Sequence, residues 1–393
     1  MALTNTPQSY GAVERTLHWL MALAILTAIT LGLIARRLPF DTAEALAGKA
    51  WVFSLHKSLG VALLVLALIR ILWAALQPRP VPLHPQRRLE TAAAALVHGA
   101  LYLSLISVPL AGWIEHSAAT GFAPILWPFG QSLPFVPKSA TLAETAGLLH
   151  RTFAWIMIGA IALHVAGALK HALVDRDDTL ARMTRGKAAG RGAGARHRGP
   201  ALAALAIYAI AAGGALALMP AGKSAAPALA PVASGWQVTD GALTFTLRQM
   251  GSEVEGRFPD WTAAIRFDQT PVEGRHGEVT VTIATETLTL GSVSEQAKAP
   301  EFFDSAAHPT ATFTADILPE GADYVARGRL TLRGVEVPVA LPFRLVIEGD
   351  VARMEGALQL DRRDFGMGKS YPDEASVGHA VGVKVVLTAQ RAD

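Results

Sequence analysis

The sequence of 393 residues contains no cysteine. This absence excludes disulfides, zinc or iron–sulfur sites built from thiolates, and the C-x-x-C-H attachment of covalently bound haem. Any metal must therefore be held by histidine, carboxylate or methionine. The sequence also lacks a constellation of side chains typical of substrate-converting enzymes, so no catalytic residue is predicted.

Apolar residues are abundant and unevenly distributed. They make up 51% of the chain, and the mean hydropathy of +0.33 is too high for a wholly soluble protein. Residues 1–220 contain nearly all the long apolar runs, whereas residues 235–393 have the composition of a soluble domain. Two modules are therefore predicted. The pI near 9.2 does not indicate a nucleic-acid partner, because the basic residues cluster between the predicted membrane spans.

Five segments are long and apolar enough to cross a bilayer. Lipid leaves an open chain no other way to satisfy its backbone polar groups, so each is expected to be helical. The predicted spans lie near residues 13–34, 51–76, 92–115, 147–172 and 201–219.

The basic residues predict how these spans are oriented. Those that follow the second and fourth spans outnumber those on the opposite side, which places the N-terminus in the cytoplasm. With five spans, everything after Pro220 is then expected in the periplasm. The residues behind this prediction are Arg79, Arg87, Arg88, Arg176, Arg182, Arg185, Lys187, Arg191, Arg196 and Arg198.

The connecting segments have simpler interpretations. The 116–143 loop contains "APILWPFGQSLPFVP" and is expected along the outer interface, with Trp127 and Phe129 at headgroup depth. Residues 186–200 form a basic cytoplasmic loop, and residues 220–234 form an Ala/Pro linker. The span at 201–219 also has the layout of a secretory signal, so it is either an anchor or is cleaved near "MPAGKSAA".

Histidines occupy matched positions in three of the spans. His150 and His164 are 14 residues apart in the fourth span, which in a helix puts them within about 40° of one face and about 21 Å apart along the axis. His18 begins the first span at the level of His164, and His56 lies in the second span at the level of His150. Two histidine pairs at two depths are the arrangement that two bis-histidine haem b groups require.

These histidines have two other interpretations. A single histidine at the end of a span is more often an interfacial residue than a ligand, but four at matched depths favour ligation. Zinc prefers three or four close protein ligands, and no cysteine or intramembrane carboxylate completes such a set. Arg70 lies 14 residues after His56, where it could pair with the propionates of the inner haem; the alternative is a snorkelling arginine.

Several motifs in residues 8–185 resemble the bacterial cytochrome b561 family of di-haem membrane cytochromes. They are "LHWL", "HKSLG" followed by Arg70, "HGALYLSLISVPLAGW", "LLHRTFAWIMIGAIALHVAGALKH" and "RDDTLARM". The resemblance implies a four-helix unit with two non-covalent haem b groups, ligated in the pairs His18/His164 and His56/His150. It also implies electron exchange with ubiquinone or another quinone.

The resemblance further places His171 near the region where quinone is handled, on nearly the same helix face as His164. A neutral imidazole there could pass a proton to or from quinone, and the alternative is an interfacial histidine beside Lys170. His98 is interpreted as structural or propionate-linked rather than axial. His84 and His197 are interpreted as surface residues.

From Trp236 onward the apolar period changes from helical to two. "ALTFTLR", "VTVTIAT", "ATFTADI" and "GRLTLRGVEVPVALPFRLVIEG" alternate apolar and polar residues, with Gly and Pro between the runs. This pattern predicts an antiparallel all-β domain. About eight such strands could close into a barrel that encloses one ligand.

Residues 235–393 resemble the YceI-like family. The resemblance depends on "VTDGALTFTLRQMGSEVEGRF", "SEQAKAPEFFDSAAHPTATFTADI", "GRLTLRGVEVPVALPFRL" and "GALQLDRRDFGMG…VGHAVGVKVVLTAQ". It implies a lipocalin-like antiparallel β-barrel whose elongated apolar cavity can hold an isoprenoid chain.

Three functions from different classes remain open. The leading hypothesis is an electron carrier between the quinone pool and an unidentified outer-side partner, and an enzyme only as a quinone-linked oxidoreductase. A sharper version oxidises superoxide outside, an anion that Lys57, Lys138 and Arg151 could attract. The second class is a membrane-tethered isoprenoid or quinone carrier. The third is a structural anchor with incidental histidines.

Overall fold

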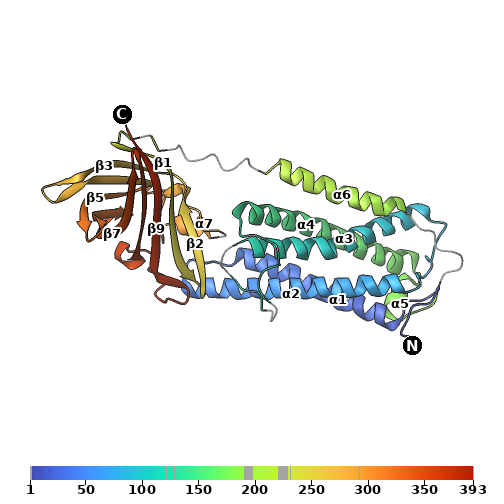
Figure 1. The fold of residues 1–393 in the computed structure, drawn as a ribbon. Helices are drawn as coiled ribbons and strands as arrows, with labels where there is room; N and C mark the ends of the chain where they lie inside the picture. Colours follow the sequence, from blue (N-terminus) through green and yellow to red (C-terminus); the bar gives the residue numbers. More distant parts are fainter. Residues whose placement is uncertain are drawn as a thin grey trace. The chain divides into compact units, whose positions relative to one another are not determined.

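The computed structural model describes residues 2–119, 123–126, 130–189, 198–219, 229–230, 232–291 and 293–392. Their contacts divide the chain into two compact units, a helical unit and a strand unit (Figure 1). Trp127, Phe129, His197 and the linker residues 220–228 and 231 lie outside the described residues, so the predictions made for them stay untested.

The helical unit contains six α-helices and one π-helical turn among the described residues. They are α1 (Ala12–Arg37), α2 (Ala43–Leu76), α3 (Arg88–Ala118), α4 (Ala140–Lys170), the turn η1 (His171–Asp175), α5 (Thr179–Thr184) and α6 (Arg198–Ala217). The start of α2, up to Ala50, is grouped with the strand unit.

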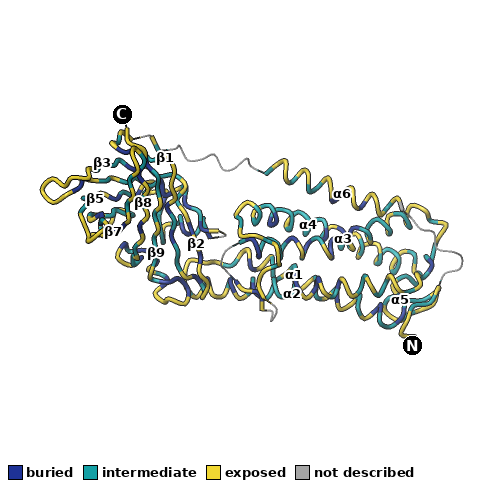
Figure 2. Tube along the Cα trace, in the orientation of Figure 1, coloured by how far each residue is buried: buried dark blue, intermediate teal, exposed yellow. Residues whose placement is uncertain are grey.

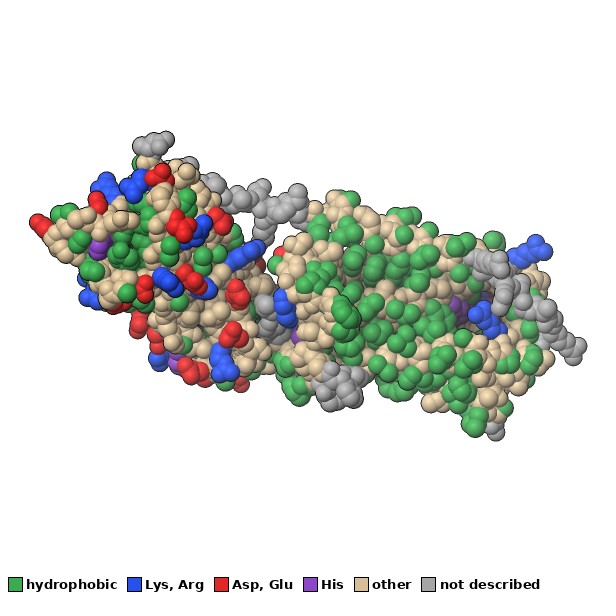
Figure 3. Space-filling view, viewed as in Figure 1, with side chains coloured by type: hydrophobic (Ala, Val, Ile, Leu, Met, Phe, Trp, Pro, Cys, Tyr) green, Lys and Arg blue, Asp and Glu red, His purple; other side chains and the backbone are tan. Residues whose placement is uncertain are grey.

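Five of these helices, all except the short α5, are long and apolar enough to cross a membrane, as the sequence predicted. Large apolar side chains on them are exposed: Leu23, Leu72 and Trp155 are 68%, 63% and 60% exposed. Much of the trace of these helices is exposed or of intermediate burial (Figure 2). In the space-filling view, apolar side chains cover the visible face of this unit (Figure 3). Such a surface suits lipid rather than water. The chain is therefore a multi-pass membrane protein.

The fifth long helix, α6, packs against α3 and α4. Ala204 and Tyr208 of α6 are buried, and the Tyr208 ring lies 5.1 Å from the Phe153 ring of α4. The Tyr208 hydroxyl is hydrogen-bonded to the hydroxyl of Ser104 in α3. The helix is therefore packed specifically against the helical unit, whereas a simple membrane anchor would need only apolar side chains.

The strand unit is one nine-stranded antiparallel sheet in the order β2-β1-β9-β8-β7-β6-β5-β4-β3. Its strands are β1 (Trp236–Gln249), β2 (Ser252–Phe258), β3 (Trp261–Val272), β4 (Arg275–Ala284), β5 (Thr310–Glu320), β6 (Asp323–Leu332), β7 (Val335–Glu348), β8 (Val351–Asp361) and β9 (Val377–Arg391). Three short helical segments connect them: η2 (Thr285–Thr287), α7 (Ser294–Lys298) and η3 (Arg362–Phe365).

The sheet curls into the lipocalin-like barrel that the sequence predicted, with nine strands rather than about eight. Among the described residues no ladder joins the edge strands β2 and β3. The start of β1 approaches β3 instead: the Gly235 amide donates to the Ile265 carbonyl at 3.0 Å, and the Trp236 indole donates to the Phe267 carbonyl at 3.3 Å. These bonds bring the two ends of the sheet together at one side.

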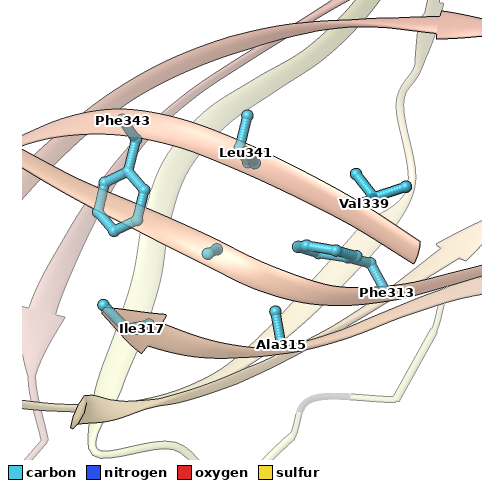
Figure 4. Close-up of a cluster of buried hydrophobic side chains, with 7 residues drawn as sticks. Phe313, Ala315, Ile317, Val339, Leu341 and Phe343 are labelled. Carbon is cyan, nitrogen blue, oxygen red and sulfur yellow. The ribbon is translucent and has the colours of Figure 1, made fainter. Parts of the chain in front are cut away.

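The inner face of the sheet is apolar because alternate residues of each strand point inward. Phe313, Ala315 and Ile317 of β5 are buried this way. Val339, Leu341 and Phe343 of β7 belong to the same cluster, which lies inside the curled sheet (Figure 4). This alternation is the period of two seen in the sequence.

Candidate haem centres and apolar cavity

His56 of α2 and His150 of α4 face each other in the helical unit. Their ring centroids are 6.1 Å apart and their planes are nearly perpendicular, at 87°. A metal bonded to one nitrogen of each ring at about 2.0 Å would hold the two centroids roughly 6 Å apart. The observed separation therefore suits two axial ligands of one iron.

Hydrogen bonds to the backbone set the orientation of both rings. The Nδ1 of His56 donates to the Ala28 carbonyl of α1 at 2.8 Å, and the Nδ1 of His150 donates to the Val108 carbonyl of α3 at 2.9 Å. A carbonyl only accepts, so each neutral ring carries its proton on Nδ1 and keeps a free lone pair on Nε2. That tautomer is the one in which Nε2 can bind a metal.

Two glycines make room for these rings. A Cβ atom added to Gly32 of α1 would lie 2.9 Å from the Cε1 of His56, and one added to Gly112 of α3 would lie 2.9 Å from the Nδ1 of His150. Each glycine comes four residues after the residue whose carbonyl binds that histidine. The glycine and that carbonyl residue therefore lie on the same face of their helix. The same local arrangement therefore occurs twice, once for each histidine.

A second pair forms at the other end of the bundle. His18 of α1 and His164 of α4 have ring centroids 6.0 Å apart, with planes at 61°. His98 of α3 lies even nearer to His164, at 5.1 Å. The structure thus brings together the two pairs that the sequence predicted, and adds a third ring beside His164.

Arg70 lies beside the second pair, as the sequence suggested. Its Nη2 lies 3.3 Å from the Nδ1 of His18 and pairs with a Glu14 carboxylate oxygen at 3.5 Å. The Nε of Arg70 and the indole nitrogen of Trp73 are buried with no hydrogen-bond partner among the described residues. Buried donors without partners are unusual in native proteins. They suit the propionate groups of a haem, so the residues present fit the cofactor at this end too.

A polar cluster surrounds the level of His56. The Lys57 ammonium lies 3.2 Å from the Nδ1 of His116 on α3. A Cβ at Gly147 of α4 would lie 2.7 Å from the Glu115 carboxylate, so this glycine makes room for an acid. Lys57 was among the residues predicted from the sequence, but Glu115 and His116 were not, because the apolar residues of α3 dominate the pattern of that helix.

A further cluster lies where α4 ends. The Nδ1 of His171 and the Nε2 of His84 both contact one Asp177 oxygen, at 2.7 and 2.9 Å. Partial burial acts to raise the pKa of Asp177, but hydrogen bonds from Thr179, His84 and His171 outweigh it and hold that pKa well below its usual range. His84 is therefore more than the surface residue that the sequence suggested.

The strand unit encloses an apolar cavity of about 270 Å³. Its lining includes Leu243, Phe245, Phe313, Leu341 and Phe343, which point inward from the strands. This volume is close to the lower end of the roughly 300–1,000 Å³ typical of ligand pockets. The cavity can therefore accept a slender apolar molecule.

Comparisons with known proteins match the two units separately. Residues 9–186 match the family described as prokaryotic cytochrome b561, and residues 236–389 match the YceI-like domain. Cytochrome b561 homolog 2 of Escherichia coli (strain K12) is 33% identical over 186 residues, which cover 47% of this chain and 95% of that protein.

Two further proteins are similar to one unit each. The probable superoxide oxidase CybB of Yersinia pestis is 29% identical over 180 residues, which cover 45% of this chain and 96% of that protein. The crystal structure of BcnA from Burkholderia cenocepacia is 28% identical, with a TM-score of 0.36, and the match covers 38% of this chain and 96% of that one.

Proposed function

Because the chain belongs to the prokaryotic cytochrome b561 family and carries a YceI-like domain, we propose that it is a di-haem electron carrier of the bacterial inner membrane. Family membership implies b-type haem. In this proposal electrons pass between the quinone pool and a redox partner on the periplasmic side. The observation that carries it is the pair of facing histidines at each of two levels, His18/His164 and His56/His150.

The chain's own residues would hold and orient the cofactors. The four imidazoles would supply nitrogens that bind the iron, and the Ala28 and Val108 carbonyls keep two of them in the ligating tautomer. Arg70 and Trp73 offer donors for propionates at the His18/His164 level. When bound there, haem b supplies reversible one-electron transfer at each level.

The cluster of His84, His171 and Asp177 is proposed to serve quinone at the cytoplasmic side. Reduction of a quinone consumes protons as well as electrons. The two imidazoles share one carboxylate oxygen, so a proton at the Nδ1 of His171 can be given up and replaced beside a fixed negative charge. This is the chemistry that quinone reduction or quinol oxidation needs.

The strand unit is proposed to lie in the periplasm and to hold an isoprenoid or quinone tail in its apolar cavity. Each CH₂ group withdrawn from water contributes about 0.8 kcal/mol, so a prenyl tail favours such a lining. The linker keeps this unit covalently tethered to the membrane unit, and tethering of this kind gives effective concentrations of about millimolar. The tether would give a lipid carrier and a quinone-linked cytochrome a common substrate.

The experiment is quinol-driven haem reduction in the purified full chain. A short-chain ubiquinol should produce the reduced-minus-oxidised spectrum of b-type haem, and His171→Ala should slow its appearance at least tenfold. His379→Ala changes a partly buried histidine of the strand unit and should leave the rate unchanged. Absence of any b-type spectrum would refute the cytochrome proposal, and equal rates in the two variants would refute the role of His171.

Truncation separates the two units. A chain that ends at Pro220 should still be reduced by a water-soluble quinol. A long-tailed quinol delivered from solution should reduce this shortened chain more slowly than it reduces the full chain. Equal rates with the long-tailed quinol, together with no prenyl lipid in the strand unit, would refute a shared role.

A superoxide:quinone oxidoreductase is the second candidate. It is favoured by Lys57 beside His56, since a cation at this level attracts an anionic substrate. Similarity to a protein named probable superoxide oxidase agrees with it. Superoxide should then reduce the haem faster at low salt, and Lys57→Gln should remove most of that salt dependence. Lys49→Gln is the matched control, and an unchanged salt dependence in Lys57→Gln would refute this version.

A further inference from the structure

Gln249 is the last residue of β1 and points into the apolar cavity. It continues the inward row of Leu243, Phe245 and Leu247, and its side chain is among the cavity-lining groups. Only 5% of the residue is exposed. An amide therefore ends a row of side chains that is otherwise apolar.

The Oε1 atom of Gln249 is buried and has no hydrogen-bond partner among the described residues. Buried polar atoms without partners are rare in native proteins, because the lost contact with water is not replaced. In the described part of the chain no group donates to this oxygen, so the molecule that fills the cavity could supply the donor.

One of the side chains that line the cavity is positively charged, which at first suggests an anionic ligand. Arg362 lines it and is 95% buried, with 5% exposed. A guanidinium has five N–H donors. All five are directed at backbone carbonyls, those of Met367, Gly368, Tyr371, Val377 and Gly378.

With every donor engaged, Arg362 has none left for a phosphate or carboxylate. Its role is to hold the segment after β8 closed over this end of the cavity. Val377, whose carbonyl binds Arg362, is also the β9 residue paired with Gln249, so the saturated cation and the free amide oxygen belong to the same end. Gln296 of α7 lines this end as well, but its amide nitrogen already donates to the Tyr371 hydroxyl at 3.1 Å.

We propose that Gln249 is the specificity-determining contact for the polar end of the bound lipid, and that this end is a neutral hydroxyl group. A prenyl alcohol, a prenylated phenol or a quinol carries such a donor, whereas a prenyl phosphate does not match the site. The inference depends on the proposed lipid-binding role of the strand unit and specifies which head group that unit accepts.

The experiment is competitive photolabelling of the full chain in detergent. A farnesol analogue that carries a diazirine is crosslinked, and labelled peptides from residues 236–392 are quantified, so binding to the helical unit does not interfere. Three competitors share one tail: farnesol, farnesyl methyl ether and farnesyl phosphate. Farnesol should compete about tenfold better than the ether, as expected for one hydrogen bond to a buried acceptor. The phosphate should compete no better than the ether.

The Gln249→Leu variant should bind farnesol and the ether equally. Its ligand-free thermal stability should not fall, because the change removes an unpaired carbonyl, whereas a structural role for Gln249 predicts a loss. Gln359→Leu, at an exposed position of β8, is the matched control and should keep the tenfold preference.

Three results would count against the inference. The first is equal competition by farnesol and the ether in the unaltered chain, the second is a preference kept in Gln249→Leu, and the third is strongest competition by the phosphate. Each of them would refute the hydroxyl assignment but not the lipid-binding role. Absence of competable labelling by any probe in residues 236–392 would refute the lipid-binding role, and this inference with it.

Discussion

His56 and His150 lie 6.1 Å apart between ring centroids, and each is hydrogen-bonded to the helix that neighbours its own in the sequence. The bond to the Ala28 carbonyl orients His56, and the bond to the Val108 carbonyl orients His150. The position of each ring therefore depends on two helices. A centre built from both rings depends on four.

Alanine substitutions of the four histidines should remove haem in pairs. His56→Ala and His150→Ala should each lose one and the same haem, because six-coordinate iron needs both nitrogens. His18→Ala and His164→Ala should lose the other. Haem is counted by the pyridine haemochrome method, and redox titration identifies which component is lost. Loss of the same component in His18→Ala and His56→Ala would show that the pairing is wrong.

The role of His98 needs a variant of its own. It lies nearer to His164 than His18 does, so His98→Ala tests whether it is an axial ligand. We expect the haem count to stay at its full value in this variant. Loss of the component that His164→Ala loses, with retention in His18→Ala, would make His98 the ligand instead.

The glycines beside the first pair should be sensitive to a single added methyl group. Gly112→Ala places a Cβ 2.9 Å from the His150 ring, which is fixed by its hydrogen bond and cannot move freely. Overpacking of this kind costs about 1–3 kcal/mol. Haem occupancy at the His56/His150 level should fall, while the other level stays filled.

Gly159→Ala is the matched control for this prediction. It lies on α4 with nothing within 4 Å of the added atom. Alanine is a better helix former than glycine by about 1 kcal/mol, so this variant should be as stable as the original chain or more so. A full haem complement in Gly112→Ala would show that the glycine is not required.

Asp177→Asn should weaken the cluster at the end of α4 across the physiological pH range. Burial raises the pKa of this carboxyl, but hydrogen bonding outweighs it and depresses the pKa in the folded state. The carboxylate therefore stabilises the folded state at pH values above its ordinary pKa near 3.9. That contribution is lost as the pH falls from there toward the low folded value. We expect the variant to be less stable by about 1 kcal/mol.

The measurement is thermal unfolding followed by intrinsic fluorescence at several pH values. The difference between the original chain and Asp177→Asn should persist from pH 5 to 8 and shrink below pH 4. Asp178→Asn changes a neighbouring, more exposed carboxyl that pairs with Lys187 and should have little effect. A difference that vanished at neutral pH would contradict the proposed role of the carboxylate.

Topology is tested by reporters at the C-terminus. A phosphatase fused after the last residue should be active and a cytoplasmic reporter there silent, because five spans with a cytoplasmic N-terminus put the C-terminus outside. The opposite pattern would reverse the orientation. The fusion should also keep its full length, since Ala204 and Tyr208 hold α6 in the helical unit. A shorter product that begins after residue 219 would mean that α6 is removed.

The predictable parts of the fold follow from local periodicity. Apolar length predicted the five long helices, and the 14-residue spacing of His150 and His164 predicted two levels. All five long helices begin before their predicted spans, because helical hydrogen bonding starts before the apolar run does. For example, α4 begins at Ala140, where the Ser139 side chain accepts a hydrogen bond from the Leu142 amide. The alternation of apolar and polar residues, which is also a local periodicity, predicted the strands of the curled sheet.

The unpredictable parts depend on contacts between distant segments. His84 and Asp177 are 93 residues apart, so no spacing rule could bring them together. The π-helical turn that begins at His171 also breaks the regular helical register that the sequence argument assumed beyond His164. The sequence does show that Gly32 leaves a gap on the face of an apolar helix. It does not show that the ring of His56 fills this gap.

The contacts of the histidines have a consequence for how the membrane unit is assembled. His56 is bonded to α1 and His18 to Arg70 of α2, whereas His150 is bonded to α3 and the His164 ring touches His98 of α3. Each half of the bundle thus arranges its own histidines, and only iron would require one imidazole from each half. Binding of haem would then tie the first two long helices to the two that leave the ribosome after them. Without it, the two halves would keep only their direct contacts, such as that of Lys57 in α2 with His116 in α3.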